Sequence, residues 1–275
     1  MTTSYPAPAK LNLFLHVVGK RNDGYHLLQT VFRFIDYSDQ LGFDSAPTPE
    51  ITLLDPIPGI PPESDLCVRA ARLLQAEAGC RLGAKIRLKK NLPMGGGLGG
   101  GSSDAATTLI VLNRLWGLNF SREKLQGIAL KLGADVPVFV FGENAFAEGI
   151  GEKLVPVSLD PAWYLVLIPP VRIPTAEVFA HAELTRNTIP IKISDFSIRQ
   201  GHNDLEPVAC RLYPVVAEYL VWLGERGRAV MTGSGSCVFA EFPNELDARR
   251  ALGELPEGMR GFLARGLDHH PLKDM

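Results

Sequence analysis

Residues 93–106 read Pro93-Met94-Gly95-Gly96-Gly97-Leu98-Gly99-Gly100-Gly101-Ser102-Ser103-Asp104-Ala105-Ala106. Six of the seven residues from 95 to 101 are glycine, which lets the backbone take positive φ and approach a ligand closely. Successive N–H groups in such a loop form an anion-binding nest, and a following helix N-terminus adds about half a positive charge. The segment therefore predicts a cradle for a triphosphate.

The loop differs from the two commonest phosphate-binding templates. Gly95, Gly97 and Gly100 satisfy the dinucleotide-binding spacing, but a run so rich in glycine does this automatically. No lysine follows the glycines, which excludes the Walker A pattern. A flexible hinge is the alternative, and it does not account for serines that lead directly into a helical pattern. We therefore interpret the loop as a phosphate cradle of another kind.

Composition describes an ordinary globular protein. The chain has 275 residues, of which 46% are hydrophobic and 21% charged, and its net charge is −2. Surface scaling predicts that about 73% of the unfolded surface is buried on folding, so no disulfide or metal is needed to stabilise the core. The near-neutral charge argues against a broad nucleic-acid surface. We expect no nucleic-acid partner.

The N-terminus and the cysteines indicate the compartment. No basic segment precedes a sustained apolar run at the N-terminus, so a secretory signal is not expected. The longest apolar runs fall far short of the ~20 residues that a membrane span requires. The four cysteines are scattered without a C-x-x-C pair, which predicts free thiols rather than a zinc or redox site. We expect a cytoplasmic protein without a membrane partner.

The hydrophobic pattern alternates between strands and helices. Alternation predicts strands over 11–17 and 86–89, the second just before the glycines, and an apolar, aromatic-rich run predicts another over 31–37. We expect one helix capped by Ser64, one capped by Ser102 and Ser103, and one from Ser121 to a left-handed cap at Gly133. The pattern restarts beyond residue 156, so we predict an α+β protein with domains 1–157 and 158–275.

Lys10, Asn12 and Asp135 are candidates for chemistry. Lys10 and Asn12 lie two residues apart on a predicted strand and so share one face. Alone, Lys10 reads as an edge-strand lysine and Asp135 as a turn or cap residue. Beside a triphosphate loop the two form a kinase set, in which a carboxylate receives the substrate hydroxyl proton and a lysine neutralises phosphoryl charge.

Other polar residues carry weaker signals. Tyr25 and His26 follow an Asn-Asp-Gly turn and suit either a base-stacking pocket or simple turn packing. One of the basic residues at positions 85, 87, 89 and 90 could assist ATP binding, although such clusters are usually solvated strand faces. His269 and His270 read as a solvated tail.

These motifs resemble the GHMP kinase superfamily. Its central motif is similar to Pro93, Gly97-Leu98-Gly99 and the serines and alanines that follow, and its C-terminal glycine motif is similar to residues 231–239. Within the superfamily the chain looks most like members whose acceptor is a cytidine diphosphate-linked methylerythritol. That likeness runs through residues 8–13, 23–26, 133–139, 145–149, 173–175 and 203–206.

The resemblance implies a fold and a set of site residues. The fold is the two-domain GHMP kinase fold, with an N-terminal ribosomal-S5-like α/β sandwich and a C-terminal ferredoxin-like domain. By resemblance Lys10 and Asp135 are the catalytic pair, and Pro93 to Ser103 wraps the ATP phosphates. The residues that resemble the cytidine side of the family's site are Asn12, Tyr25, His26, Thr175 and Phe179.

The implied reaction is ATP-dependent phosphorylation of the 2-hydroxyl of the methylerythritol unit, in the non-mevalonate route to isoprenoid precursors. Another small-molecule kinase of the homoserine or mevalonate type and a non-catalytic nucleotide sensor are the alternatives. The family often has Asn-Leu where this chain has Asp65-Leu66, so an adenine contact by that amide does not carry over. Mg²⁺ is expected, with Ser103 as a candidate ligand, and the chain is expected to be a monomer or homodimer.

Overall fold

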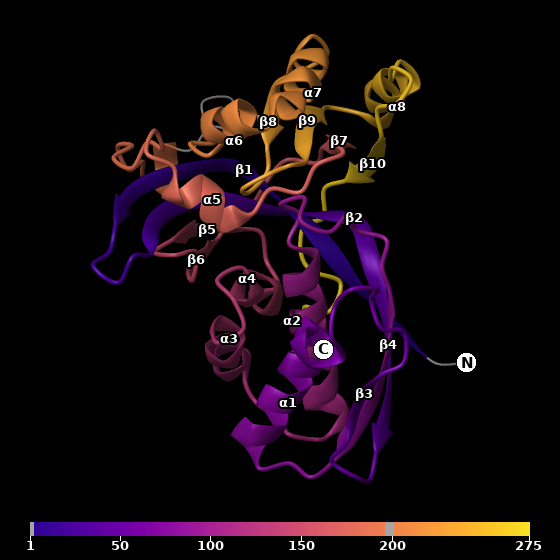
Figure 1. The fold of residues 1–275 in the computed structure, drawn as a ribbon. Helices are drawn as coiled ribbons and strands as arrows, with labels where there is room; N and C mark the ends of the chain where they lie inside the picture. Colours follow the sequence, from indigo (N-terminus) through magenta and orange to yellow (C-terminus); the bar gives the residue numbers. More distant parts are fainter. Residues whose placement is uncertain (1–2, 196–200) are drawn as a thin grey trace.

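A computed structural model describes residues 3–195 and 201–275. Its frame is a long antiparallel hairpin of β1 (Ser4–Lys20) and β2 (His26–Ala46), paired from Ser4 opposite Gly42 to Lys20 opposite His26. The strands predicted over 11–17 and 31–37 form the middle of this hairpin and extend well beyond those limits. In Figure 1 the hairpin runs through both halves of the molecule, so the site residues on β1 lie between them.

The first sheet has the order β3-β4-β2-β5-β6, with β1 paired to β2. Its other strands are β3 (Ile51–Leu53), β4 (Gly83–Lys89), β5 (Ala145–Glu148) and β6 (Lys153–Pro156). Four helices share a core with this sheet: α1 (Leu66–Ala78), α2 (Gly100–Leu115), α3 (Arg122–Leu130) and α4 (Val136–Phe141). Figure 1 shows them together beside the sheet, with α2 next to the hairpin. This layer positions the glycine loop.

The helix termini correct three sequence expectations, two at helix starts and one at a helix C-terminus. Asp65, not Ser64, caps α1, because its carboxylate accepts the Cys67 N–H at 2.8 Å. The helix after the glycines begins at Gly100 behind a left-handed Gly99, so Ser102 and Ser103 lie inside its first turn and cap nothing. The left-handed cap expected at Gly133 is also wrong, since α3 ends at Leu130 and Gly133 has no positive φ.

The second sheet is fully antiparallel, with the order β10-β7-β9-β8. Its strands are β7 (Trp163–Leu167), β8 (Ala229–Met231), β9 (Val238–Phe242) and β10 (Gly261–Arg265). Numbered within this half, the order is 4-1-3-2, the ferredoxin-like arrangement that the resemblance implied. The helices of this half are α6 (Glu206–Leu212), α7 (Pro214–Gly224) and α8 (Glu245–Gly253).

Three short elements complete the described chain. Helix α5 (Thr175–Ala180) lies near the site, and single 3₁₀ turns are η1 (Pro62–Ser64) and η2 (Ile193–Asp195). None of the helices in the described ranges is both long and apolar enough to span a bilayer.

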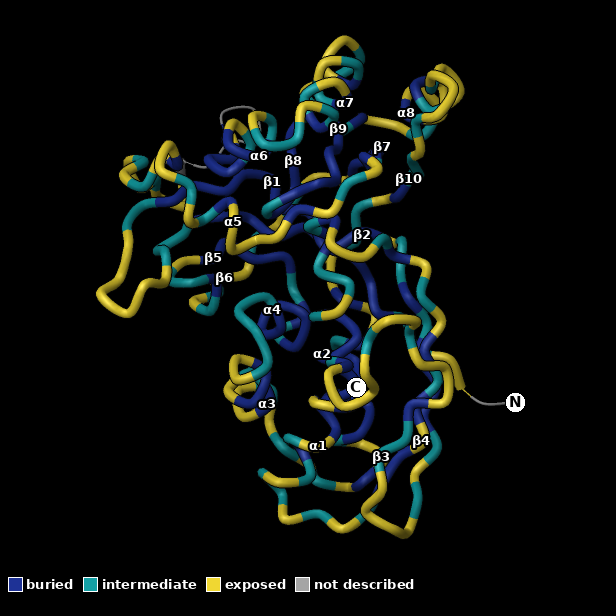
Figure 2. Tube along the Cα trace, viewed as in Figure 1, coloured by how far each residue is buried: buried dark blue, intermediate teal, exposed yellow. Residues whose placement is uncertain are grey.

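The two halves share buried side chains. Leu15 and Val17 of β1 pack in the core of the second sheet, and the Leu15 N–H donates to the His202 carbonyl at 2.9 Å. The C-terminal segment returns to the first half, where the Leu267 N–H donates to the Phe34 carbonyl. His270 is therefore fully buried, which corrects the expectation of a solvated tail. Figure 2 shows β1 buried along most of its length.

Candidate functional site

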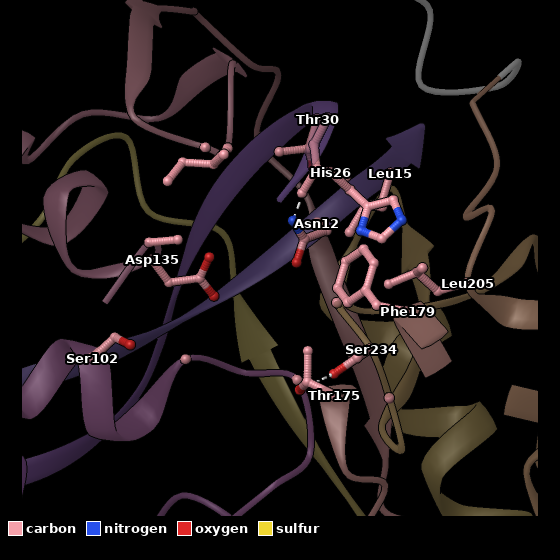
Figure 3. Close-up of a pocket in the computed structure, with 18 of the residues that line it drawn as sticks. Asn12, Leu15, His26, Thr30, Ser102, Asp135, Thr175, Phe179, Leu205 and Ser234 are labelled. Carbon is pink, nitrogen blue, oxygen red and sulfur yellow. Dashed lines mark hydrogen bonds between the residues drawn. The ribbon is translucent and has the colours of Figure 1, made fainter. Parts of the chain in front are cut away.

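Lys10 and Asp135 form an ion pair that lines a large cavity. The Nζ of Lys10 lies 3.3 Å from Oδ2 of Asp135. The lysine side chain is 2% exposed and the aspartate side chain 41% exposed, so a buried ammonium pairs with a solvent-accessible carboxylate. Asp135 precedes α4 without capping it, which leaves its carboxylate free to face the cavity (Figure 3). Lys10 is therefore buried and does not act as a solvent-facing lysine that protects a strand edge.

Polar neighbours hold the lysine in place. Its Nζ donates to Oδ1 of Asn12 at 2.5 Å, and its backbone N–H donates to the Leu98 carbonyl in the glycine loop. Asn12 in turn donates to the Thr30 hydroxyl at 3.0 Å. The Phe32 ring lies 5.4 Å from Nζ, within cation–π range. These contacts aim a buried positive charge at the Asp135 carboxylate and the loop.

The glycine loop packs against a second glycine segment. The Cys237 N–H donates to the Gly96 carbonyl at 3.1 Å, and the Thr232 hydroxyl donates to the Gly97 carbonyl at 3.4 Å. At Gly97 the φ is +78°, and a Cβ there would lie 2.1 Å from the Thr232 carbonyl oxygen. The approach is so close that only glycine fits at position 97.

A cavity of about 710 Å³ opens on one side of this loop. Its walls come from the β1–β2 hairpin, from α5 and from both glycine segments. The predicted residues Lys10, Asn12, Tyr25, His26, Asp135, Thr175 and Phe179 all line it. Figure 3 shows His26 and Phe179 at one side of the cavity and Asp135 with Ser102 at the other. The structure thus gathers the predicted substrate and catalytic residues around one space.

A second cavity of about 450 Å³ lies on the other side of the loop. Pro93 to Ser102 line it together with Asp65, Leu66, Ile57 and Ile60. Gly95, Gly97, Gly99 and Ser102 line both cavities. The two spaces therefore meet at the glycine loop, beside Lys10 and Asp135. Sequence reasoning missed Ile57 and Ile60, because an apolar residue in a proline-rich segment carries no local signal of a ligand.

The far end of the first cavity is aromatic. The His26 ring stacks on Phe179 with a centroid distance of 4.9 Å and an interplanar angle of 27°. Burial, with the positive charges of Arg186 and Lys20, lowers the pKa of His26 below its usual value. Tyr25 is 58% exposed at the rim. The Thr175 and Ser234 hydroxyls are 2.7 Å apart and close the wall from the second half.

Lys90 is the member of the basic strand cluster that borders the second cavity. Its Nζ pairs with Asp104 at 2.7 Å and with the fully buried Asp39. Asp39 also accepts the N–H groups of Asn91 and Leu92 at 2.6 and 2.8 Å. Burial raises the pKa of Asp104 despite the opposing charge of Lys90. This triad fixes the strand exit that leads into the glycine loop.

Oxygen donors near the loop bear on metal binding. No group of three or more His, Cys, Asp or Glu side chains suited to a metal occurs within residues 3–195 and 201–275. Ser102 and Asp135 border the first cavity. Ser103 lines neither cavity, and its buried hydroxyl has no partner in the described part of the chain. A Mg²⁺ carried on phosphate oxygens needs few protein ligands, and the oxygens of Ser102 and Asp135 fit that need.

The arrangement suits phosphoryl transfer. The loop offers backbone N–H groups at the N-terminus of α2, where negative charge is favoured. The first cavity brings any acceptor it holds to the Asp135 carboxylate, and Lys10 lies between that carboxylate and the loop. Such a transfer depends on positioning and charge neutralisation more than on covalent catalysis by the protein.

Comparison with known proteins agrees with this geometry. The family models for the GHMP kinases N terminal domain and the GHMP kinases C terminal match residues 65–143 and 193–261. The 4-diphosphocytidyl-2-C-methyl-D-erythritol kinase of Nitrosospira multiformis is 66% identical over 98% of this chain and 93% of that protein. The enzyme of the same name from Nitrosomonas eutropha is 65% identical over 98% of this chain and 99% of that protein.

Solved structures place the fold in the same group. A crystal structure of 4-(cytidine 5'-diphospho)-2C-methyl-D-erythritol kinase superposes with a TM-score of 0.83 and 34% identity, covering 96% of this chain and 99% of that one. A mevalonate kinase superposes with a TM-score of 0.72 at 16% identity over 97% and 99% of the two chains, which shows the shared fold. The chain belongs to the GHMP kinase family and, within it, to the 4-diphosphocytidyl-2-C-methyl-D-erythritol kinases.

Proposed function

We propose that this kinase transfers the γ-phosphoryl group of ATP to the 2-hydroxyl of 4-diphosphocytidyl-2-C-methyl-D-erythritol. The product would feed the non-mevalonate route to isoprenoid precursors. The observation that carries the proposal is the Lys10–Asp135 pair, which lies where a large aromatic-ended cavity meets a glycine phosphate loop.

The two cavities divide the substrates between them. We assign the second cavity and the loop from Pro93 to Ser103 to ATP, since its glycine wall offers N–H groups and Ile57 and Ile60 offer an apolar surface for a base. We assign the first cavity to the acceptor. Its stacked His26 and Phe179 rings suit a pyrimidine, and Tyr25, Asn12 and Thr175 line the same cavity.

Asp135 and Lys10 have complementary roles in the proposed transfer. The Asp135 carboxylate accepts a hydrogen bond from the acceptor hydroxyl, orients its oxygen toward the γ-phosphorus and receives its proton as the bond forms. The Lys10 ammonium pairs with that carboxylate at 3.3 Å and balances charge on the transferred group. Asn12 fixes the direction of the ammonium through its 2.5 Å hydrogen bond.

Mg²⁺ is the expected metal. When bound, it neutralises charge on the nucleotide phosphates. We propose that the Ser102 hydroxyl and the Asp135 carboxylate are the protein oxygens available to it or to its water shell, because both border the cavity beside the loop.

We further propose the domain division 1–157 and 158–275, which falls between β6 of the first sheet and β7 of the second. We also propose that the protein is a cytoplasmic monomer or homodimer without nucleic-acid partners. The four cysteines are free thiols, as in most proteins of a reducing compartment.

An ADP-release assay across acceptors tests the function. We expect release with the cytidine diphosphate methylerythritol and none with homoserine or mevalonate. Release with mevalonate or homoserine alone would assign the chain to another small-molecule kinase. Absence of release with every acceptor, in protein that binds ATP, would favour a nucleotide sensor.

A further inference from the structure

Arg186 belongs to none of the kinase motifs and contacts the stacked His26 and Phe179 of the first cavity. It follows α5 in the chain, and its Nε donates to Nε2 of His26 at 3.2 Å. Its other nitrogens donate to three carbonyls, those of Phe179 and His181 from Nη2 at 3.1 and 2.7 Å, and that of Leu184 from Nη1 at 3.1 Å. Arg186 therefore joins the first residue of β2 to the end of α5.

The donor chemistry of arginine fixes the protonation of His26. A guanidinium is always charged and has only N–H donors, so Nε2 of His26 must accept with its lone pair. A histidine whose Nε2 accepts is neutral and carries its single proton on Nδ1. The lowered pKa of His26 agrees with the neutral form, since burial and the charges of Arg186 and Lys20 all oppose a second positive charge.

The remaining ring nitrogen is then a donor with no protein partner. Nδ1 of His26 makes no hydrogen bond to the part of the chain that the structure describes, and the side chain lines the cavity. Phe179 holds the ring plane by stacking at 4.9 Å, and Arg186 binds the carbonyl of the same Phe179. Arg186 thus sets the tautomer of His26, and Arg186 and Phe179 together set the orientation of its ring.

We propose that Arg186 is a positioning residue that fixes His26 as an Nδ1–H donor and so favours cytosine over uracil in the acceptor pocket. The inference rests on the proposed function, which places a pyrimidine in the first cavity, beside the edge of the His26 ring. Cytosine presents two neighbouring acceptors, N3 and O2, on its pairing edge. Uracil carries a hydrogen on N3, which opposes an N–H donor at that position.

The tautomer is tested in the free protein, without any substrate. Nitrogen-15 NMR of the histidine rings, with the His26 signal assigned through His26→Gln, distinguishes a protonated Nδ1 from a protonated Nε2. We expect protonation on Nδ1 in the unmodified chain and a mixture of the two forms in Arg186→Met. Protonation on Nε2 in the unmodified chain would overturn the proposal, whatever the enzyme phosphorylates.

Calorimetric titration with CDP and UDP tests the consequence. We expect the unmodified chain to bind CDP about tenfold more tightly than UDP, and Arg186→Met to bind the two within about threefold. Arg186→Lys keeps the charge and one donor, so it should retain most of the preference. The exposed Arg250→Met on α8 controls for the loss of a positive charge.

A purely structural role for Arg186 predicts a different result. Loss of the three carbonyl contacts alone would weaken CDP and UDP binding equally in Arg186→Met and leave their ratio unchanged, which would overturn the proposal. Equal binding of CDP and UDP by the unmodified chain would overturn it as well. The ADP-release assay decides the proposed function separately, because it does not depend on this ratio.

Discussion

The Nζ of Lys10 lies 3.3 Å from the Asp135 carboxylate, and the two residues come from opposite ends of the N-terminal half. Lys10 belongs to β1, the strand shared by both halves, and Asp135 immediately precedes α4. The glycine loop touches Lys10 directly, since a Cβ at Gly99 would lie 3.1 Å from its Cε. The loop, the lysine and the carboxylate are therefore one packed unit, and substitutions within it have separable effects.

Asp135→Asn should remove the proton acceptor while keeping the shape of the site. We expect turnover to fall by about 10²–10⁴ with ATP affinity nearly unchanged, because the amide keeps an oxygen for Mg²⁺ or its water shell but cannot take the hydroxyl proton. Steady-state ADP release and a nucleotide titration measure the two quantities. The exposed Asp55→Asn, outside both cavities, is the matched control. Unaltered turnover in Asp135→Asn would remove this residue from the proposed mechanism.

Lys10→Met should lower turnover without unfolding the protein. The thioether chain fills a similar volume, but the charge that faces Asp135 and the hydrogen bond to Asn12 are lost. We expect turnover to fall by about 10²–10³, as for other removed transition-state donors. The matched control is Lys153→Met, which replaces an exposed lysine of β6. A loss confined to KM, with kcat kept, would show that Lys10 only binds substrate.

Gly97→Ala should disrupt the contact between the two glycine segments. An alanine Cβ would lie 2.1 Å from the Thr232 carbonyl oxygen, in addition to the strain of a φ of +78°. We expect a loss of about 3 kcal/mol or more in unfolding free energy and at least a tenfold higher KM for ATP.

Gly117→Ala is a matched control for this substitution. Gly117 has a φ of +65° and nothing within 4 Å of a built Cβ, so it isolates backbone strain. It should cost about 1 kcal/mol and leave the ATP KM unchanged. Equal losses in the two variants, measured by urea unfolding, would show that the contact between the segments contributes nothing.

The sequence predicted the parts of the site whose chemistry is local. The glycine run and the Lys10–Asn12 spacing are visible within a few residues, and the structure brings them together with Asp135. The predicted cap residues of α1 and α2 were wrong. Ser64 and its neighbour Asp65 are both good cap residues, so the pattern does not choose between them, and a left-handed glycine can start a helix without a side-chain cap. Arg186 was missed because its contacts to His26 arise only from folding.

The buried C-terminal histidine gives the last prediction, on pH dependence. Burial lowers the pKa of His270 to about 3, and its Nδ1 accepts the Leu272 N–H at 3.0 Å. The unfolded chain binds a proton at this residue below pH 6.5 and the folded chain does not, so stability falls as pH drops from about 6.5 toward 3.

His270→Asn keeps an acceptor near the position of Nδ1 but cannot be protonated. It should lower stability at pH 7.5 by about 2 kcal/mol, because the ring that packs on Phe34 is lost. It should also flatten the decline of unfolding free energy between pH 6.5 and 4, to which His270 contributes about 3 kcal/mol. Urea unfolding across this range measures both effects, with the exposed His269→Asn as the control. An unchanged slope in His270→Asn would mean that the carboxylates alone set the acid sensitivity, and that the folded protein admits a proton at His270.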